Sequence, residues 1–299
     1  MAGVRGGVGV SDLSDNDLLL MIDEEDRQLH LQGLHLSARQ FNCVVEVCRR
    51  LGHTFSIGVV RDPFVERLQV LTRNFFRPKD GGAPSIFIGL MTHLGFSYQV
   101  HVPIIFGSCS VEPFNHTDAT EWQLRRIYRV PSEFDVCFKQ VCDVWDIGTQ
   151  LGPLDGKVHL DGRVAELFNL ATFHLTAAVA TVSQRTASRG AAQSALISSE
   201  LAIKALHAAN GRSDKWIKTH ISHDLVKNFS DIRHNLGKDS EMVLNNLEVL
   251  PPLVSERYGN IEIEALKIAE LVVVAQQILA AVARSFCGYG YRQKFEMTR

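Results

Sequence analysis

The stretch AAQSALISSELAIKALHAAN, residues 191–210, decides the fold class of the second half of the chain. Small and apolar side chains recur in it every three to four positions, which is the period of an amphipathic helix. These residues are Ala195, Leu196, Ser199, Leu201, Ala202, Ala205 and Leu206. Gly211 follows the stretch and predicts the end of the helix.

The same helical period continues on both sides of this stretch, through most of the second half of the chain. Pro251 and Pro252 allow a helix to start or kink there, but they do not allow one to run through unbroken. We therefore predict an all-α, up-and-down bundle of four or five helices over residues 157–299. The other predicted helices cover residues 163–184, 224–236, 240–250 and 261–286.

Residues 1–150 have a different character, because short segments are separated there by Pro and Gly. Alternation with a period of two predicts strands, and capping residues before an apolar stripe predict helices. We therefore predict an α+β N-terminal domain of no recognised family, followed by a linker over residues 148–156. The predicted strands cover residues 27–36, with a kink at Gly33, then 55–60, 85–91, 96–102 and 104–111, and the predicted helices begin near Ser37, Asp62 and Ser132.

The composition excludes several classes of protein. The chain has 299 residues and a formal net charge of −2, which excludes a surface that is basic all over but allows a local basic patch. The first ten residues lack the apolar core of a signal peptide. The six cysteines are dispersed without a CxxC pair, which is typical of a reduced, cytoplasmic protein. Charged residues in the apolar run 265–286 favour a buried helix, so we expect no membrane association.

Three fragments follow one another on the predicted helices of the second half. They are Ser199-Glu-Leu-Ala-Ile-Lys-Ala-Leu206, Thr219-His-Ile-Ser-His223-Asp224-Leu225 and Glu256-Arg257-Tyr258. Their order and spacing, over about residues 163–286, resemble a HEPN domain. The resemblance implies an α-helical bundle that forms a homodimer, in a protein of prokaryotic stress or defence. HEPN domains either bind RNA, a nucleotide or a partner protein, or act as metal-independent ribonucleases.

The ribonuclease branch of the HEPN family carries an Arg, four to six further residues and then a His, near the start of the last helix. In this chain no His follows Arg257. The sequence therefore favours a binding and dimerisation protein. The alternatives are a divergent, toxin-like, metal-independent endoribonuclease and a bundle that serves only as a dimerisation device.

The candidate site residues lie in and around the segment 211–220, which is basic and contains one Trp, and at Arg257-Tyr258. A metal-free ribonuclease needs an acid or base and a cation beside the phosphate, and the catalytic candidates are His220, His223 and Arg257. A basic segment with an aromatic residue also suits base stacking beside phosphate contacts. The candidate ligand-binding residues are Lys204, Arg212, Lys218, His223, Asp224, Arg257 and Tyr258.

Each of these candidates also has a purely structural interpretation. Asp224 can cap the helix that follows it, Arg257 can pair with a nearby carboxylate, and the basic segment can be an exposed loop. His93, His101 and His116 lie in or beside predicted strands without the spacing of a metal motif. The sequence has neither a phosphate loop nor the GxSxG motif of serine hydrolases, so we expect no metal and no cofactor.

Overall fold

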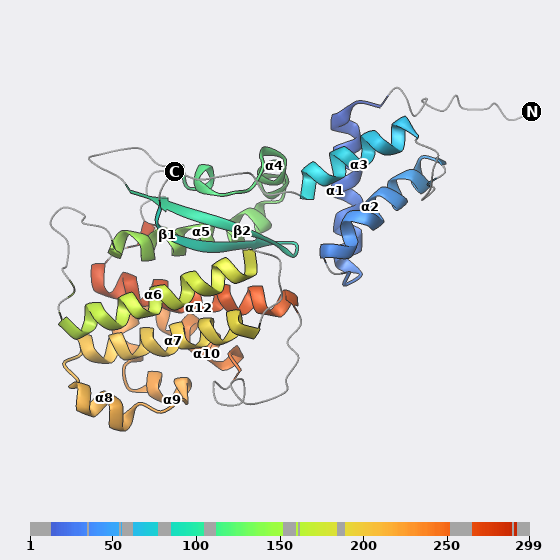
Figure 1. Ribbon diagram of the computed structural model, residues 1–299. Coiled ribbons are helices and arrows are strands. Elements are labelled where there is room, and N and C mark those ends of the chain that lie inside the picture. The colour runs from blue at the N-terminus through green and yellow to red at the C-terminus, as the bar shows by residue number, and fades with distance from the viewer. Residues whose placement is uncertain are drawn as a thin grey trace, which may run out of the picture. The chain divides into compact units, whose positions relative to one another are not determined.

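The computed structural model describes residues 13–34, 36–53, 55, 62–76, 85–104, 112–151, 160, 162–183, 189–251, 265–288 and 290–291. These residues form mostly α-helices, together with one two-stranded sheet (Figure 1). The chain divides into two compact units. Unit 1 comprises Met1–Asp80, Leu94–Phe96 and Ala119–Val130, and unit 2 comprises Gly81–His93, Ser97–Asp118 and Pro131–Arg299.

The described residues of unit 1 form the helices α1 (Asp15–Leu31), α2 (Leu36–Arg50), α3 (Pro63–Phe76) and α4 (Glu121–Arg129). Side-chain caps determine where three of them begin. Ser14 and Thr120 form capping boxes at α1 and α4, and the Asp62 carboxylate accepts hydrogen bonds from the first turn of α3. The buried core includes Leu18, Ile22, Cys43, Val47, Leu68, Phe75 and Phe96.

Unit 2 contains a β-hairpin and the longest described helices. Helix α12 packs against α5, α6 and α7, helix α6 packs against α7, and strand β1 packs against α5, α6 and α12 (Figure 1). The predicted helical character of the second half is thus confirmed, while a HEPN-like layout stays a prediction. The elements are β1 (Ser85–His93), β2 (Phe96–Pro103, with Phe96 in unit 1), η2 (Pro113–His116), α5 (Pro131–Leu151), α6 (Gly162–Ser183), α7 (Arg189–Ala209), α8 (Asp214–His220), α9 (Leu225–Ser230), η3 (Arg233–Asp239), α10 (Ser240–Val249) and α12 (Ala265–Cys287).

The predicted strand at residues 27–36 is wrong, because its first half belongs to α1. The buried residues of α1 recur at helical spacing from Leu18 to Leu29, whereas the alternation of Leu29 with Leu31 covers too short a window to identify a strand. Gly33, which was expected to kink a strand, has a φ of +80° just after the helix. Glycine is favoured there because it takes the left-handed conformation without strain.

The helices predicted from Ser37 and Asp62 are confirmed as α2 and α3, and the strands predicted at residues 85–91 and 96–102 are confirmed as β1 and β2. The first half is nevertheless more helical than expected. Over the described part of residues 1–151 there are two strands and five α-helices, where four or five strands and three helices were predicted. The strands predicted at residues 55–60 and 104–111 lie outside the described residues, apart from Phe55 and Ile104.

Strand β1 lies directly on two helices, and this close contact groups the hairpin with the C-terminal half. A Cβ atom at Gly89 would lie 2.3 Å from Cγ2 of Val144 and 2.7 Å from Oε1 of Gln276. Gly148, predicted to be in a linker, is instead in α5, where a Cβ atom would lie 2.7 Å from Cγ2 of Val102. The two compact units therefore do not divide near residue 150, because α5 and β1 share a core with the later helices.

Two of the described helices, Gly162–Ser183 and Lys267–Cys287, are long and apolar enough to cross a membrane by length and composition. The most apolar window of the first is 39% buried inside the structure, and that of the second is 61% buried. Core helices of water-soluble proteins meet the same criterion, so the two helices are weak evidence for membrane spans. The cytoplasmic location stays a prediction.

Candidate functional site

The described candidate residues lie near the C-terminal end of α7, on α8 and in the short segments just before α8 and α9, all within unit 2. Glu200, Lys204 and His207 are spaced by four and three residues, so they share one face of α7. Lys204 Nζ lies 2.5 Å from Glu200 Oε1, and His223 Nδ1 lies 3.2 Å from Glu200 Oε2. Two predicted ligand-binding residues therefore converge on one carboxylate, which is a contact that sequence reasoning did not include.

A second group forms at the start of α8 and along it: Arg212 lies just before the N-cap Ser213, and Trp216 and His220, spaced by four residues, share one face of the helix. The Arg212 guanidinium lies 4.6 Å from the centre of the Trp216 ring. The imidazole of His220 stacks on the same indole, with ring centres 4.7 Å apart and planes inclined by 6°. We call these three residues the α8 column. Arg212 and His220 are exposed and Trp216 is half-buried, so two planar cationic or titratable groups face solvent.

The hydrogen bonds of His220 define which of its ring nitrogens is available. Nδ1 lies 3.0 Å from the backbone oxygen of Trp216 and 2.8 Å from Oγ1 of Thr219. Because a carbonyl oxygen only accepts hydrogen bonds, the neutral imidazole carries its proton on Nδ1. The exposed Nε2 is then an acceptor that can take a proton from a ligand.

The surface around the column is cationic. Lys215 and Lys218 are exposed and form no salt bridge with any residue that the structure describes. The guanidinium of Arg212 lies over Trp216 and, among the described residues, pairs with no carboxylate. The acidic residue of the same helix, Asp214, is paired with Arg163, at 2.7 Å between Oδ1 and Nε. The positive charges on α8 are therefore not neutralised by the described side chains around them.

His207, on α7, contacts both α9 and Trp216. It is 1% exposed, its Nε2 lies 2.8 Å from the backbone oxygen of Asn228, and its ring is 5.4 Å from that of Trp216. Burial lowers the pKa of His207, so the imidazole is neutral at pH 7 and donates to the carbonyl. Asp224 is the N-cap of α9, because its Oδ1 accepts a hydrogen bond of 3.0 Å from the backbone N–H of Lys227. The predicted structural role of Asp224 is thus confirmed.

The structure separates the described candidates into two groups. Lys204 and His223 meet at Glu200, and Arg212 and His220 meet at Trp216. Lys218 stands beside the second group on α8. Arg257 and Tyr258 lie outside the described residues, so the proposed pairing of a histidine with Arg257 stays a prediction.

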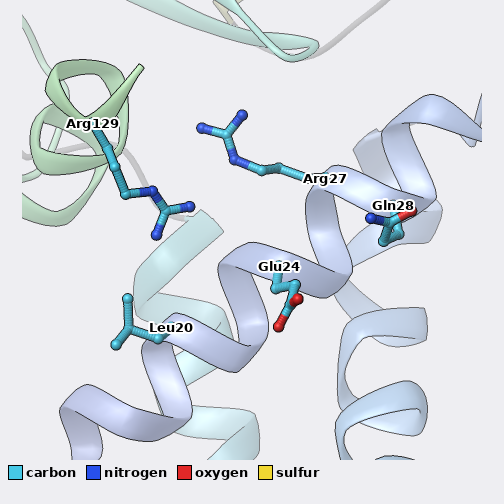
Figure 2. A pocket seen from close by; sticks show the side chains of 5 residues that line it. All are labelled: Leu20, Glu24, Arg27, Gln28 and Arg129. Carbon is cyan, nitrogen blue, oxygen red and sulfur yellow. The ribbon is translucent and has the colours of Figure 1, made fainter.

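Unit 1 contains a pocket of about 460 Å³ that none of the predicted site residues lines. It is lined by Leu20, Glu24, Arg27, Gln28 and Arg129, from α1 and α4 (Figure 2). Sequence reasoning missed this pocket because it assigned part of α1 to a strand and did not assign α4. The usable signal was the Arg125-Arg126-x-x-Arg129 spacing, which places two arginines on one face of a helix.

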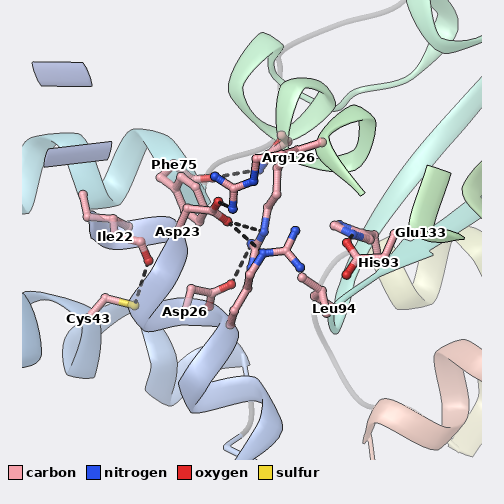
Figure 3. Close-up of polar contacts among 12 residues, drawn as sticks. Ile22, Asp23, Asp26, Cys43, Phe75, His93, Leu94, Arg126 and Glu133 are labelled. Atoms are coloured by element: carbon pink, nitrogen blue, oxygen red, sulfur yellow. Dashed lines mark hydrogen bonds and ion pairs between the residues drawn. The ribbon is translucent and has the colours of Figure 1, made fainter. Parts of the chain in front are cut away.

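A buried network of charges around Asp23, Asp26 and Arg126 (Figure 3) contacts the pocket residues Arg27 and Arg129 through Asp23. Asp23 and Asp26 have no exposed surface, and Arg126 is 1% exposed. Nε of Arg126 lies 2.5 Å from Asp23, and its Nη1 lies 2.7 Å from Asp26. Arg39, also fully buried, lies 3.1 Å from the other oxygen of Asp26, and Arg129 pairs with Asp23. These pairs bind α1, α2 and α4 together.

Among the described residues, no group of three or more His, Cys, Asp or Glu side chains is placed to hold a metal ion. His93 pairs with Glu133 at 2.7 Å, and His101 Nδ1 lies 3.1 Å from the Ser85 hydroxyl. Burial lowers the pKa of His101 and of His116. The three histidines weighed as metal ligands therefore have other surroundings in the structure.

Comparison with known proteins yields no relative. The chain matches no protein-family model, no curated protein and no solved structure. The HEPN resemblance, the homodimer and the RNA or nucleotide ligand consequently stay predictions that rest on the quoted fragments and on the geometry of the site.

Proposed function

We propose that the α8 surface binds single-stranded RNA without cleaving it. The observation that carries the proposal is the α8 column, Arg212, Trp216 and His220, with the exposed cations of Lys215 and Lys218 beside it. Single-stranded nucleic acids are bound by aromatic and guanidinium planes that stack on bases, next to cations that track the phosphates. The column supplies the first requirement, and the lysines supply the second.

The aromatic and cationic side chains of the α8 column suit a ligand that has both bases and phosphates. Stacking contributes about 1–3 kcal/mol per base, and it is tolerant of sequence because every base has a π-face. Each phosphate neutralised by a lysine or arginine releases a counterion, which makes the affinity depend on salt. A chain with a net charge of −2 can bind RNA in this way only through a local patch, and α8 supplies such a patch.

The test is fluorescence anisotropy of a labelled single-stranded RNA with the full chain, titrated at several salt concentrations. Trp216→Ala is expected to weaken binding by about tenfold or more. Lys218→Gln is expected to reduce the slope of log K against log salt by about 0.7. The matched control is Lys139→Gln, which removes the same charge from α5. His220→Ala is a second variant on the column in case Trp216→Ala disturbs the packing on His207.

The proposal is overturned if the wild-type chain does not retain single-stranded RNA, or if Lys139→Gln weakens binding as much as Lys218→Gln. Equal affinity for a duplex of the same length also contradicts it, because paired bases offer no face for stacking on the column. Retention of a mononucleotide alone would instead support a nucleotide-binding site.

A divergent ribonuclease is the second candidate, and one observation favours it. The exposed Nε2 of His220 is available as a base, because the carbonyl oxygen of Trp216 holds the proton on Nδ1. The test is incubation of the same RNA with the chain in EDTA. Cleavage that His220→Ala abolishes would replace the binding function with a catalytic one, and intact RNA that stays bound would support the first proposal.

We further propose that the partner in a homodimer binds the exposed face of α6. Phe173 is 71% exposed and Leu170 is 39% exposed on this helix. The helix carries no Asp, Glu, Lys or Arg from Leu167 to Ser183. In a two-fold dimer the same patch faces itself, so an uncharged apolar face avoids like-charge repulsion.

Size-exclusion chromatography with light scattering tests the dimer. We expect the wild-type chain to be a dimer and the Phe173→Glu variant to be a monomer. The control is Val249→Glu, which adds the same charge at another exposed apolar residue and should stay dimeric. A monomeric wild-type chain would contradict this part of the proposal.

A further inference from the structure

The pocket of unit 1 is lined by side chains suited to an anion. Figure 2 shows the guanidinium groups of Arg27 and Arg129 extending toward one another, from α1 and α4. Gln28 adds an amide donor to the lining, and Leu20, which is 45% exposed, adds an apolar edge. Two guanidinium groups on one opening match the oxygens of a phosphate, which they can bind through paired N–H donors.

The cationic side of the pocket is held in place by a buried carboxylate. Asp23 has no exposed surface, and both of its oxygens are used in ion pairs, Oδ1 with Arg126 and Oδ2 with Arg129. Arg27 Nε also lies 3.7 Å from Oδ1. Because Asp23 orients Arg129 from behind, a ligand in front meets a guanidinium that needs little rearrangement.

The charge of Arg129 is not fully matched by its surroundings. Among the described residues its ion-pair partner is Asp23, which Arg126 already contacts at 2.5 Å. The guanidinium has five N–H donors, and the Arg129 side chain is 47% exposed toward solvent. The carboxylate in the pocket, Glu24, is itself paired with Arg50 at 2.6 Å. The pocket therefore presents the partly exposed guanidinium of Arg129, whose charge the described carboxylates match only in part.

From this arrangement we infer that the pocket of unit 1 binds the phosphoryl group of a small phosphate monoester. The dianionic group lies between Arg27 and Arg129, and the remainder of the molecule extends along Leu20 and Gln28. The described residues that line the site come from α1 and α4, none of them from α8, so this inference does not depend on the proposed RNA function.

The experiment is isothermal titration calorimetry of the full chain, with inorganic phosphate or glycerol phosphate as the ligand. Sodium chloride keeps the ionic strength constant. Arg129→Gln is expected to weaken binding of both by at least about tenfold, which corresponds to about 1.4 kcal/mol. Arg129→Lys keeps the charge and loses the two-pronged donor set, so an intermediate loss is expected. The matched control is Arg125→Gln, on the same helix, whose guanidinium pairs with Glu121 at 2.6 Å and which does not line the pocket.

Three results would overturn the inference. Arg129→Gln with wild-type affinity excludes the site, and an equal loss in Arg125→Gln shows only general attraction of anions to α4. Acetate that binds as tightly as phosphate excludes a phosphoryl-specific pocket. If Arg129→Gln unfolds unit 1, Arg27→Gln serves as the second variant, because its contact with Asp23 is longer. Trp216→Ala should bind phosphate like the wild type, which separates this result from the failure of the RNA proposal.

Discussion

The side-chain amide of Gln276 bonds both backbone groups of Leu90, which lies 186 residues earlier in the chain. Its Oε1 accepts from the Leu90 N–H at 2.8 Å, and its Nε2 donates to the Leu90 carbonyl at 2.9 Å. The same Nε2 lies 3.3 Å from the carbonyl oxygen of Gln140. Gln276 is fully buried, so this one amide joins β1, α5 and α12 inside the core of unit 2.

Replacement of Gln276 by Leu should strongly destabilise unit 2. Leucine fills a similar volume but leaves the N–H and carbonyl of Leu90 without their partner, and each buried unsatisfied group costs about 1–3 kcal/mol. We expect the free energy of unfolding in urea to fall by about 3 kcal/mol. The control is Gln277→Leu, since the Oε1 of Gln277 accepts, among the described residues, from the Asn246 side chain at 2.9 Å and from no backbone group. A loss no larger than that of the control would contradict the role assigned to Gln276.

Substitution of Gly89 by Ala tests how closely β1 lies on α5. The added Cβ atom would meet Cγ2 of Val144 at 2.3 Å, and such overpacking costs about 1–3 kcal/mol. The expected result is a lower urea midpoint for Gly89→Ala and partial recovery in the double variant Gly89→Ala with Val144→Ala. Losses that simply add in the double variant would show that the two residues are not in contact.

The pH dependence of stability should report on Asp143. Burial raises the pKa of Asp143 to about 7, although Arg284, at 2.7 Å, favours the ionised form. The folded chain therefore holds a proton on Asp143 that the unfolded chain has released above about pH 4, so this contribution to stability falls as pH rises to about 7. Asp146 and Asp239 also contact Arg284, so the guanidinium keeps partners in Asp143→Asn.

We expect Asp143→Asn to gain stability relative to the wild type between pH 5 and pH 8, by more than about 1 kcal/mol. The measurement is urea denaturation of both proteins at several pH values. Histidine titrations affect both proteins alike and cancel in the difference. Asp135→Asn, an exposed residue of the same helix paired with Lys139, is the control, and its difference from the wild type should not change with pH. Parallel curves for Asp143→Asn and the wild type would show that Asp143 does not titrate in this range.

The buried network of unit 1 should be intolerant of losing a single partner. Arg126→Met removes the charge that faces both Asp23 and Asp26, which have no exposed surface. Breaking a buried ion pair on one side costs about 3–5 kcal/mol, because it leaves a charge buried and unpaired. Arg125→Met, one residue away and exposed, is expected to lower the unfolding free energy by less than about 1 kcal/mol. Similar values for the two variants would contradict the network.

Two substitutions at Asp224 distinguish a cap from a ligand-binding carboxylate. Asp224→Ala should cost about 1 kcal/mol of stability, because the N–H of Lys227 loses its acceptor. Asp224→Asn keeps a capping oxygen and should cost only a few tenths of that amount. In the anisotropy assay neither variant should change the affinity for RNA. A large change in affinity with Asp224→Asn would assign this carboxylate to the site rather than to the fold.

The sequence by itself determined the local elements of this protein. Capping residues and a period of three to four predicted α2, α3, α6, α7, α10 and α12, because those signals lie between residues close along the chain. It also singled out the basic segment 211–220 with its one Trp, but it predicted no helix there, so it did not predict that Arg212 and His220 stack on Trp216. The candidate residues at 204–224 were named from the sequence, whereas their contacts with Glu200 and Trp216 came from the structure.

Which faces of the helices and strands pack against one another was decided by the tertiary structure alone. Nothing local in the sequence relates Gln276 to Leu90, or Asp23 to Arg126 and Arg129, because these contacts join helices and strands that are far apart along the chain. The boundary between the two units was unpredictable for the same reason. The local sequence of α5 predicts a helix, but it does not tell that this helix packs on β1 and α12. The physical reason is burial. A carboxylate or amide that is exposed to water needs no protein partner, whereas the same group in a core must be paired, and the sequence does not show which groups are buried.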